Sequence, residues 1–381
     1  MGAAPSPQPV SPRASLRDRL PDFPWDRLEP YKATAAAHAE GIVDLSVGTP
    51  VDPVPALVQQ ALTAAADSPG YPTVWGTAAL RDALTGWAAD RLGARGLEHT
   101  NVLPVVGSKE LVAWLPTQLG LGPGDKVAYP RLAYPTYEVG ARLAGAEPVV
   151  YDEPWELDPS GLKLLWLNSP SNPTGRVLGA DELRRAVAWA REHGVLVVSD
   201  ECYLELGWEA DPVSVLHPDV CGGSHDGLVA VHSLSKRSNL AGYRSAFLIG
   251  DAAVLGDLLQ IRKHGGMMIA APVQARHRRG AGRHRPCRRA ARALRPPPYR
   301  TARRLRGRGL PHRAQRGLAL PLGDPRRVLL GHRRRPRQAR HPRRPRRLLR
   351  SGGGAVRTDR LHRHRRAGGR RGAPAGRLSR V

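Results

Sequence analysis

Four short apolar runs of the chain each end in polar residues whose types could do chemistry. Open parallel sheets bind ligands beyond the carboxyl ends of their strands, so residues that follow consecutive strands are expected to meet at one edge. The four polar segments are residues 107–109, 168–175, 199–203 and 233–236. Together they contain two amines, a carboxylate pair, a phenol, two asparagines and several hydroxyl groups.

Each segment taken alone has an ordinary structural explanation. Asn-Pro-Thr-Gly at residues 172–175 is a favourable turn. Asp200, which follows a strand-like run, could cap a helix, and a single lysine such as Lys236 is nearly always a solvated charge. As a set in this order, the segments are harder to explain in this way.

The set resembles the class I and II aminotransferases, which are fold-type I pyridoxal phosphate (PLP) enzymes. The resemblance runs from about residue 43 to residue 272 and rests on Asn172-Pro173-Thr174-Gly175, Asp200-x-x-Tyr203, Ser233-x-Ser235-Lys236 and Arg244. Residues 71–76, 105–110 and 133–137 are most similar to the actinobacterial N-succinyldiaminopimelate aminotransferases of lysine biosynthesis. The resemblance implies a PLP-dependent aminotransferase with amino-acid and 2-oxo-acid substrates.

Three residues would be catalytic by this resemblance. Lys236 would form the Schiff base with the PLP aldehyde and then carry a proton to or from the substrate Cα. This requires a pKa lowered by burial or by a nearby cation. Asp200 would keep the ring nitrogen protonated, since an opposite charge favours the charged form, and Tyr203 would hydrogen-bond the phenolate oxygen.

The resemblance also implies the binding residues. A helix N-terminus attracts phosphate, and an arginine can hold it with a charge-assisted fork. The phosphate would therefore be bound by Gly107, Ser108, Lys109, Ser233, Ser235 and Arg244. Tyr134 would stack on the ring, Asn172 would bind the phenolate oxygen and the substrate, and Gly48 would let the backbone approach the substrate carboxylate. Tyr71 would reach the phosphate of a neighbouring subunit, which implies a homodimer.

Lys109 is the alternative to Lys236 as the Schiff-base residue. It opens a helix directly after a strand, where its backbone suits a phosphate and its side chain is expected to point to solvent. We therefore favour Lys236.

Alternating strand-like and helical segments predict an α/β fold, with a mostly parallel sheet between helices. Strands are expected at 42–49, 102–106, 126–129, 147–151, 163–167, 195–199 and 228–232, and helices at 55–67, 77–93, 137–144 and 180–193 and after residue 107. With the resemblance, this is a fold-type I PLP-dependent transferase large domain with an incomplete small domain. The expected division is an N-terminal arm at 1–45, a PLP-binding domain at 46–270 and an aberrant tail at 275–381.

The tail at 275–381 has a different composition from the rest of the chain. It holds 37 Arg, no Lys, and only Asp324 and Asp359 as acidic residues, a net charge of +35. The residues before it hold 22 basic and 31 acidic side chains, so their net charge is −9 although the whole chain carries +26. The basic character of the chain is therefore confined to the tail.

Two explanations of the tail compete. A long block of like charge is usually disordered and can bind nucleic acid as a non-specific polyanion. The tail, however, lacks Lys, Ile, Phe, Asn and Met, which favours GC-rich codons read out of frame. We expect a disordered tail that replaces the C-terminal small domain, so the arginine that pairs with the substrate carboxylate cannot be assigned and activity is impaired.

Composition leaves two alternative functions open. One is another class I aminotransferase acting on an aspartate, aromatic or branched substrate, and the other is an inactive PLP-fold module with a nucleic-acid-binding tail.

Cys202, Cys221 and Cys287 form no metal or disulfide spacing, which favours a reducing compartment. The Pro-rich N-terminus has no apolar export segment, and no apolar run reaches the length of a membrane span. We expect a cytoplasmic protein with no metal and no membrane partner.

Overall fold

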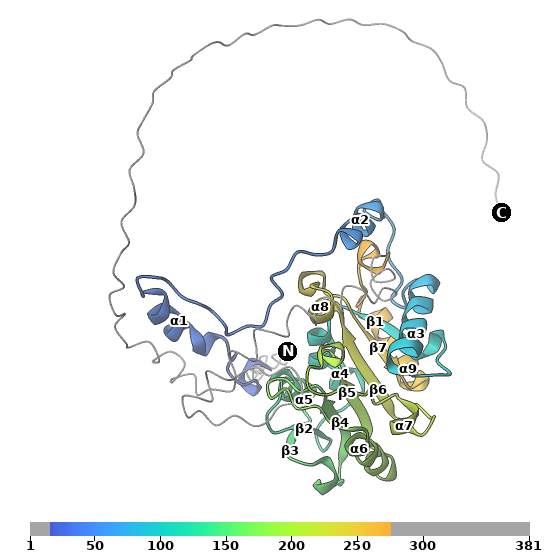
Figure 1. Ribbon diagram of the computed structural model, residues 1–381. Coiled ribbons are helices and arrows are strands. Elements are labelled where there is room, and N and C mark those ends of the chain that lie inside the picture. The colour runs from blue at the N-terminus through green and yellow to red at the C-terminus, as the bar shows by residue number, and fades with distance from the viewer. Residues whose placement is uncertain (1–15, 276–381) are drawn as a thin grey trace, which may run out of the picture. The chain divides into compact units, whose positions relative to one another are not determined.

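The computed structural model describes residues 16–275. Expectations that concern residues 1–15 and 276–381, including the disorder expected of the tail, lie outside this range. The described part is built around one mixed sheet with helices on both faces (Figure 1).

The sheet has seven strands in the order β1-β7-β6-β5-β4-β2-β3. Their bounds are β1 Val102–Val105, β2 Lys126–Pro130, β3 Glu147–Tyr151, β4 Leu162–Asn168, β5 Leu196–Asp200, β6 Leu228–Ser233 and β7 Ala246–Gly250. Every pairing is parallel except those of β7, which runs antiparallel to β1 and to β6. This confirms the mostly parallel sheet expected from the sequence.

Nine α-helices occur in residues 16–275: α1 Glu29–Ala36, α2 Ala56–Ala64, α3 Ala78–Leu92, α4 Ser108–Gln118, α5 Thr136–Ala144, α6 Ala180–Glu192, α7 Pro218–Cys221, α8 Leu234–Arg237 and α9 Ala252–His264. The 3₁₀ turns are η1 Leu16–Arg19, η2 Asp26–Leu28, η3 His99–Asn101, η4 Pro154–Glu156, η5 Leu204–Leu206 and η6 Ala241–Tyr243. The expected helices are present, each within a few residues of the predicted ends.

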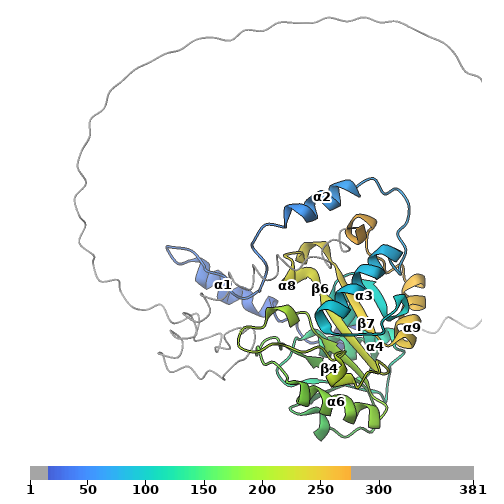
Figure 2. The same ribbon diagram turned by 45° about the vertical axis from the view of Figure 1, so that its right-hand side comes forward.

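The core consists of two apolar clusters, one on each face of the sheet. Helices α3 and α6 contribute to one cluster, and α4, α5 and α9 contribute to the other; Figure 2 shows α3 lying across the sheet. Successive strand residues alternate between the clusters, because side chains of a strand point to opposite faces. Val197 and Ala230 belong to the first cluster, and Val198 and Val231 to the second.

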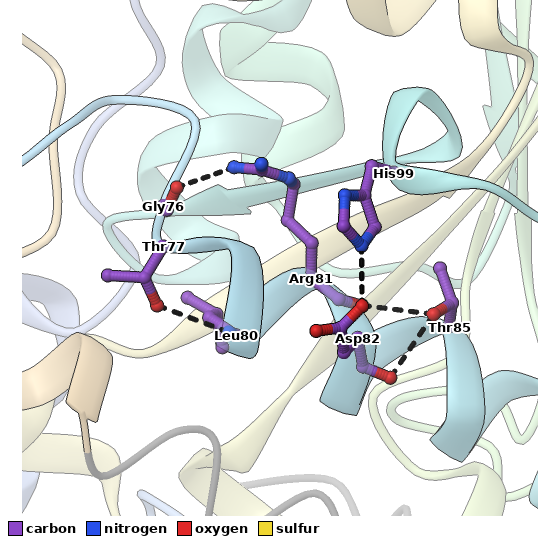
Figure 3. A network of polar contacts seen from close by, with 7 residues as sticks. All are labelled: Gly76, Thr77, Leu80, Arg81, Asp82, Thr85 and His99. Atoms are coloured by element: carbon purple, nitrogen blue, oxygen red, sulfur yellow. Dashed lines mark hydrogen bonds and ion pairs between the residues drawn. The ribbon is translucent and has the colours of Figure 1, made fainter.

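The start of helix α3 is fixed by local polar contacts (Figure 3). The hydroxyl group of Thr77 caps the helix by accepting from the backbone N–H of Leu80 at 3.2 Å. Arg81 donates to the carbonyl of Gly76 at 2.6 Å, and Asp82 pairs with Nε2 of His99 at 2.7 Å. These contacts tie α3 to the turn before it and to η3.

Helices α4 and α9 are joined by a buried arginine. Arg262 has no exposed surface and donates to both carboxylate oxygens of Glu110, at 3.2 and 2.9 Å, and to Gln118 at 3.3 Å. A buried charge needs such partners to offset its desolvation. Glu110 lies in the first turn of α4, so this pair also holds the N-terminus of that helix against the rest of the domain.

One predicted strand is wrong. Residues 42–49 contain no strand, and Val43, Leu45 and Val51 are 84%, 82% and 93% exposed. Apolar alternation alone does not make a strand, which also needs a neighbouring backbone for its hydrogen bonds, and no described strand pairs with this segment. Conversely, β7 and α9 have no counterpart among the individual elements predicted above.

Candidate active site

The polar segments picked out from the sequence meet at one edge of the sheet because β4, β5 and β6 are adjacent and parallel. Asn168 pairs in register with Asp200, and Asp200 with Val231. Ala246, the first residue of β7, pairs with both Val105 and Ser233. The ends of β1 and β6 therefore flank the start of β7 and bring residues 107–109, 233–236 and Arg244 to the same edge.

Asp200 ends β5 with a carboxylate held by two donors. The side chain is 8% exposed, and it accepts from the hydroxyl of Tyr137 at 2.9 Å and from the backbone N–H of Cys202 at 3.1 Å. Burial raises the pKa of Asp200, and the hydrogen bonds from Cys202 and Tyr137 oppose that shift. The fold thus holds a carboxylate in a fixed orientation at the cost of desolvating it.

Cys202 links the carboxylate to the amine of the site. Burial raises the pKa of its thiol, the Asp200 charge raises it further, and Ser108 and Lys236 act in the opposite direction. Burial also raises the pKa of Tyr203, with smaller contributions from Cys202, Asp200 and Tyr134. Cys202 donates its backbone N–H to the Asp200 carboxylate, so Asp200, Cys202 and Tyr203 lie together at the end of β5.

Lys236 extends from the last turn of the short helix α8 toward the loop that holds Gly48. Its Nζ donates to the carbonyl oxygen of Gly48, and a Cβ added to Gly48 would lie 4.0 Å from that nitrogen. Burial lowers the pKa of Lys236, while the nearby Cys202 raises it. The amine of Lys236 therefore lies next to the loop that holds Gly48.

Arg244 lies directly over Gly107 at the N-terminus of α4. A Cβ built on Gly107 would come within 2.2 Å of Nη2 of Arg244, and Gly107 has φ +84°. Arg244 itself has φ 50°, a left-handed conformation that costs a non-glycine residue about 1 kcal/mol. Because the first N–H groups of a helix lack partners within it, the guanidinium and the start of α4 form a cationic cradle.

Hydroxyl groups complete the rim of this cradle. The hydroxyl of Ser233 caps α8 by accepting from the N–H of Ser235 at 3.1 Å, and the two hydroxyls lie 2.9 Å apart. Ser108 is the first residue of α4. The sequence-predicted set of Gly107, Ser108, Ser233, Ser235 and Arg244 is therefore brought together.

Asn172 and Tyr134 are held at the carboxyl ends of β4 and β2. The N–H of Asn172 donates to Oδ1 of Asn168 at 2.7 Å, and Asn168 donates to the carbonyl of Asp200 at 2.9 Å. Burial raises the pKa of Tyr134, a hydrogen bond with Thr136 lowers it, and Asp200, Cys202 and Arg244 also act on it. Tyr134 is thus near enough to Asp200 and Arg244 for both charges to affect its pKa.

Two predicted residues lie apart from this cluster. Lys109 is exposed, and its ammonium lies 5.0 Å from the ring centroid of Phe23 and 5.5 Å from that of Trp25. Its side chain therefore makes cation–π contacts with the N-terminal arm, while its backbone remains at the start of α4. Tyr71 is 99% exposed and lines a hollow together with Thr73, Ala271 and Gln274.

Sequence reasoning missed three residues that shape the site: Tyr137, Cys202 and Asn168. Asn168 was visible as the polar end of an apolar run, but its role as the brace between Asp200 and Asn172 depends on strand pairing. Tyr137 is three residues after Tyr134, at helical spacing, which could have suggested that it faces the same sheet edge. Cys202 had no signal beyond its place between Asp200 and Tyr203.

The residues present fit PLP. The amine of Lys236 suits an aldehyde, the buried carboxylate of Asp200 suits a protonated ring nitrogen, and the cradle formed by Gly107 and Arg244 suits a phosphate dianion. Among residues 16–275, no group of His, Cys, Asp or Glu could hold a metal ion. In the same range, no helix combines the length and apolar character required to cross a bilayer.

A comparison with protein families matches residues 40–276 to the family "Aminotransferase class I and II". The chain belongs to this family, and PLP, the cofactor expected from the sequence, is the cofactor of the family. The match ends within two residues of the point at which the composition of the chain changes.

Three similar proteins refine this placement. A probable aminotransferase of Mycobacterium tuberculosis is 60% identical over 275 residues, which cover 72% of this chain and 64% of that protein. The 4-dedimethylamino-4-oxo-anhydrotetracycline transaminase OxyQ of Streptomyces rimosus is 59% identical over 256 residues, covering 67% and 71%. The structure of a probable N-succinyldiaminopimelate aminotransferase of Thermus thermophilus has a TM-score of 0.67 at 27% identity, covering 74% and 80%. The chain thus spans slightly less than two thirds of the Mycobacterium relative.

Proposed function

We propose that this chain carries the catalytic machinery for PLP-dependent amino transfer, with Lys236, Asp200 and Tyr203 as the catalytic residues. The observation that carries the proposal is that Asp200 ends β5 and Lys236 follows the end of the adjacent parallel strand β6, with Arg244 over Gly107 at the same edge of the sheet. A buried anion and a half-buried amine beside a cationic cradle form the set of groups that PLP requires.

Lys236 is the proton carrier of the proposed reaction. When bound, PLP supplies an electron sink for the charge that develops at the substrate Cα. Lys236 takes the Cα proton and returns it, and burial favours its neutral, basic form at lower pH than for a solvated lysine. Asp200 holds a proton on the ring nitrogen through its fixed carboxylate, which the Tyr137 and Cys202 hydrogen bonds orient.

The remaining residues bind and orient. Tyr203 and Asn172 provide hydrogen bonds for the phenolate oxygen, and Tyr134 provides an aromatic face. Gly107, Ser108, Ser233, Ser235, Arg244 and the backbone of Lys109 hold the phosphate. Gly48, whose carbonyl accepts from Lys236, would let the backbone approach the substrate carboxylate. The fully exposed Tyr71 is available to a second subunit, which supports a homodimer.

N-succinyl-diaminopimelate with 2-oxoglutarate is the substrate pair that we propose first. Sequence segments at 71–76, 105–110 and 133–137 and the likeness to the Thermus structure support it. The 59% identity to the Streptomyces transaminase favours a second candidate, a polycyclic ketone as amino acceptor. Paired assays with the two acceptors distinguish these substrates, because only one of them is expected to be aminated.

We further propose that turnover by this chain is weak. The family match stops at residue 276, and none of the arginines beyond it can be assigned to the substrate carboxylate. Without a bidentate arginine, substrate binding loses a pair of charge-assisted hydrogen bonds. A chain that turns over succinyl-diaminopimelate as fast as full-length relatives would contradict this part of the proposal.

Trapping of the cofactor on its lysine tests the core of the proposal. The full chain is incubated with PLP, reduced with borohydride and digested, and the modified peptide is identified by mass spectrometry. We expect the label on Lys236 and its loss in Lys236→Ala, while the matched Lys109→Ala variant retains it. Labelling of Lys109 instead, or of surface lysines at random, refutes the assignment.

A further inference from the structure

Glu201 and His232 form an isolated polar pair inside the apolar core, directly behind the proposed site. Nε2 of His232 lies 3.3 Å from Oε2 of Glu201, with the side chains 3% and 1% exposed. Oε1 of Glu201 accepts from the N–H of Val215 at 2.7 Å. Among the described residues, neither Oε2 nor Nε2 has a further hydrogen-bond partner, so each is satisfied only if a proton lies between them.

The pair faces away from the proposed cofactor side. Strand alternation places Glu201 and His232 on the face that carries Trp87 and Phe247, opposite to Asp200. The imidazole ring packs edge-on against Trp87 at 4.8 Å and stacks on Phe247 at 5.4 Å. An apolar cage of this kind disfavours a charged imidazole.

Two consecutive buried carboxyl groups lie at the end of β5: Asp200 is its last residue and Glu201 follows it. Two adjacent anions in a dry site repel each other, so one of them is expected to retain a proton. Asp200 accepts hydrogen bonds from Tyr137 and Cys202. Glu201 accepts from the N–H of Val215 through Oε1, while its Oε2 lies 3.3 Å from Nε2 of His232 and accepts no hydrogen bond from the residues that the structure describes. The surroundings thus differentiate the two carboxyl groups.

The other charged groups around the pair do not change which of the two residues is expected to hold the proton. Burial raises the pKa of Glu201 to about 7, opposed by hydrogen bonds from Val215, Ser214 and Ser199 and supported by the Asp200 charge. Burial and, to a smaller extent, Arg237 lower the pKa of His232 to about 3. Charged groups from the neighbouring elements are Glu205 on η5, Arg237 on α8 and Arg91 on α3, and both arginines pair with Glu205.

We propose that Glu201 and His232 are a buried pair that holds one proton on the Glu201 carboxyl group, which donates to Nε2 of His232, so that Asp200 is the single anion at the end of β5 below neutral pH. Glu201 and His232 are therefore positioning residues, which act on the proposed reaction only through Asp200.

This assignment has an unusual consequence for stability. In the unfolded chain the proton of the pair resides on His232 between about pH 4.5 and 6.5, the ordinary pKa values of the two groups. In the folded chain it resides on Glu201 over the same range. Both states then bind one proton, so the pair contributes no pH dependence to stability in this window.

Removing one member of the pair makes the folding stability depend on pH through the other member. The two variants are expected to show dependences of opposite sign. In Glu201→Gln, the lowered pKa of His232 remains, so stability is present above pH 6.5 and is lost as pH falls toward 3. In His232→Asn, the raised pKa of Glu201 remains, so stability is present below pH 4.5 and is lost as pH rises toward 7. Each slope approaches a tenfold change in the unfolding equilibrium constant per pH unit.

Urea unfolding of the full chain without PLP, at pH 5.0, 5.5, 6.0 and 6.5, tests the proposal independently of the proposed enzymatic function. Relative to the unsubstituted chain, Glu201→Gln is expected to lose stability toward pH 5.0 and His232→Asn toward pH 6.5. Asp82→Asn is the matched control, because the His99–Asp82 pair has a 2.7 Å contact but is 39% and 68% exposed (Figure 3). Parallel profiles for all four proteins, or slopes of the same sign, overturn the proposal.

A measurement on the unsubstituted chain covers the case in which a variant does not fold. Imidazole ¹⁵N spectra at pH 5.0 are expected to show a neutral His232 ring, with Nε2 accepting a hydrogen bond; the resonance is assigned by its loss in His232→Asn. In Glu201→Gln that resonance shifts because its donor changes from O–H to N–H. A His232 ring that is charged at pH 5.0 overturns the proposal.

Discussion

The hydroxyl group of Tyr137 donates a 2.9 Å hydrogen bond to Oδ2 of Asp200 from a fully buried position near the start of α5. Its ring stacks on Trp166, with centroids 4.9 Å apart, so the donor cannot turn away. Burial disfavours the anionic form of Asp200, and this bond is one of the few contacts that oppose the effect. The proposed anchor of the PLP ring nitrogen thus depends on a residue 63 positions away in the sequence.

Tyr137→Phe removes that donor and leaves the ring in place. Hydrogen bonds to charged groups contribute about 1.5–3 kcal/mol, so the affinity for PLP is expected to fall about tenfold or more, measured by fluorescence titration. Tyr151→Phe is the matched control, since Tyr151 is also buried but donates to the carbonyl of Trp166 at 2.6 Å. It should lose stability without a change in PLP affinity, and equal losses of affinity in both variants would count against the role of Tyr137.

Gly107→Ala places a methyl group against the guanidinium of Arg244 and forces alanine into φ +84°. We expect PLP affinity to fall at least tenfold, with a loss of stability of about 1 kcal/mol from the backbone strain. Gly96→Ala introduces a similar backbone strain at φ +73°, but its added Cβ has no atom within 4 Å. The difference between the two variants, measured by PLP titration and urea unfolding, isolates the effect on the cradle, and its absence would contradict the placement of the phosphate.

Arg262→Met leaves the carboxylate of Glu110 without its buried partner. Removing one member of a buried ion pair costs about 3–5 kcal/mol, and we expect a loss near 3 kcal/mol because Glu110 is partly exposed. Arg185→Met removes an exposed arginine that lies 4.1 Å from the Trp155 ring centroid, and should cost about 1 kcal/mol or less. Similar urea midpoints for the two variants would rule out a structural role for the buried pair.

Lys236→Met is expected to stabilise the PLP-free chain at neutral pH. Burial lowers the pKa of Lys236 below its ordinary 10.5, so the charged amine destabilises the folded state at pH 7. This cost disappears as pH rises toward 10.5, because the lysine becomes neutral in both states. Thermal unfolding between pH 7 and 10 should therefore show the variant's advantage shrinking with pH. An advantage that grows with pH would exclude a desolvated amine.

The double substitution Val43→Ser and Leu45→Ser is expected to reduce concentration-dependent self-association of the full chain. Both side chains are more than 80% exposed in the segment that forms no strand, and exposed apolar surface favours association. Light scattering over a range of concentrations provides the measurement. Ile261→Ser, at a residue that is 42% exposed on α9, is the control and should change association little. Unchanged scattering in the double variant would locate the association elsewhere.

The sequence by itself predicted most of the helices and strands and the polar segments at the edge of the sheet. Apolar runs such as residues 228–233 form strands because burial of both faces requires continuous apolar side chains, and polar residues after them mark the carboxyl edge. Asp200, Lys236, Tyr203 and Arg244 were picked out from these polar segments through the resemblance to the aminotransferase family, and their roles stay a prediction. The conformation of residues 42–49 could not be predicted, because alternating apolar residues form a strand only if a neighbouring strand is available to pair with them.

Only the tertiary structure decided which groups touch. Strand order β1-β7-β6-β5 brings Arg244 onto Gly107, and helix α5 brings Tyr137 onto Asp200. It also separates the two carboxyl groups of Asp200 and Glu201 onto opposite faces of the sheet, where one meets hydrogen-bond donors and the other meets a caged imidazole. Such pairings join residues far apart in the chain and depend on strand register and burial, which local sequence patterns do not encode.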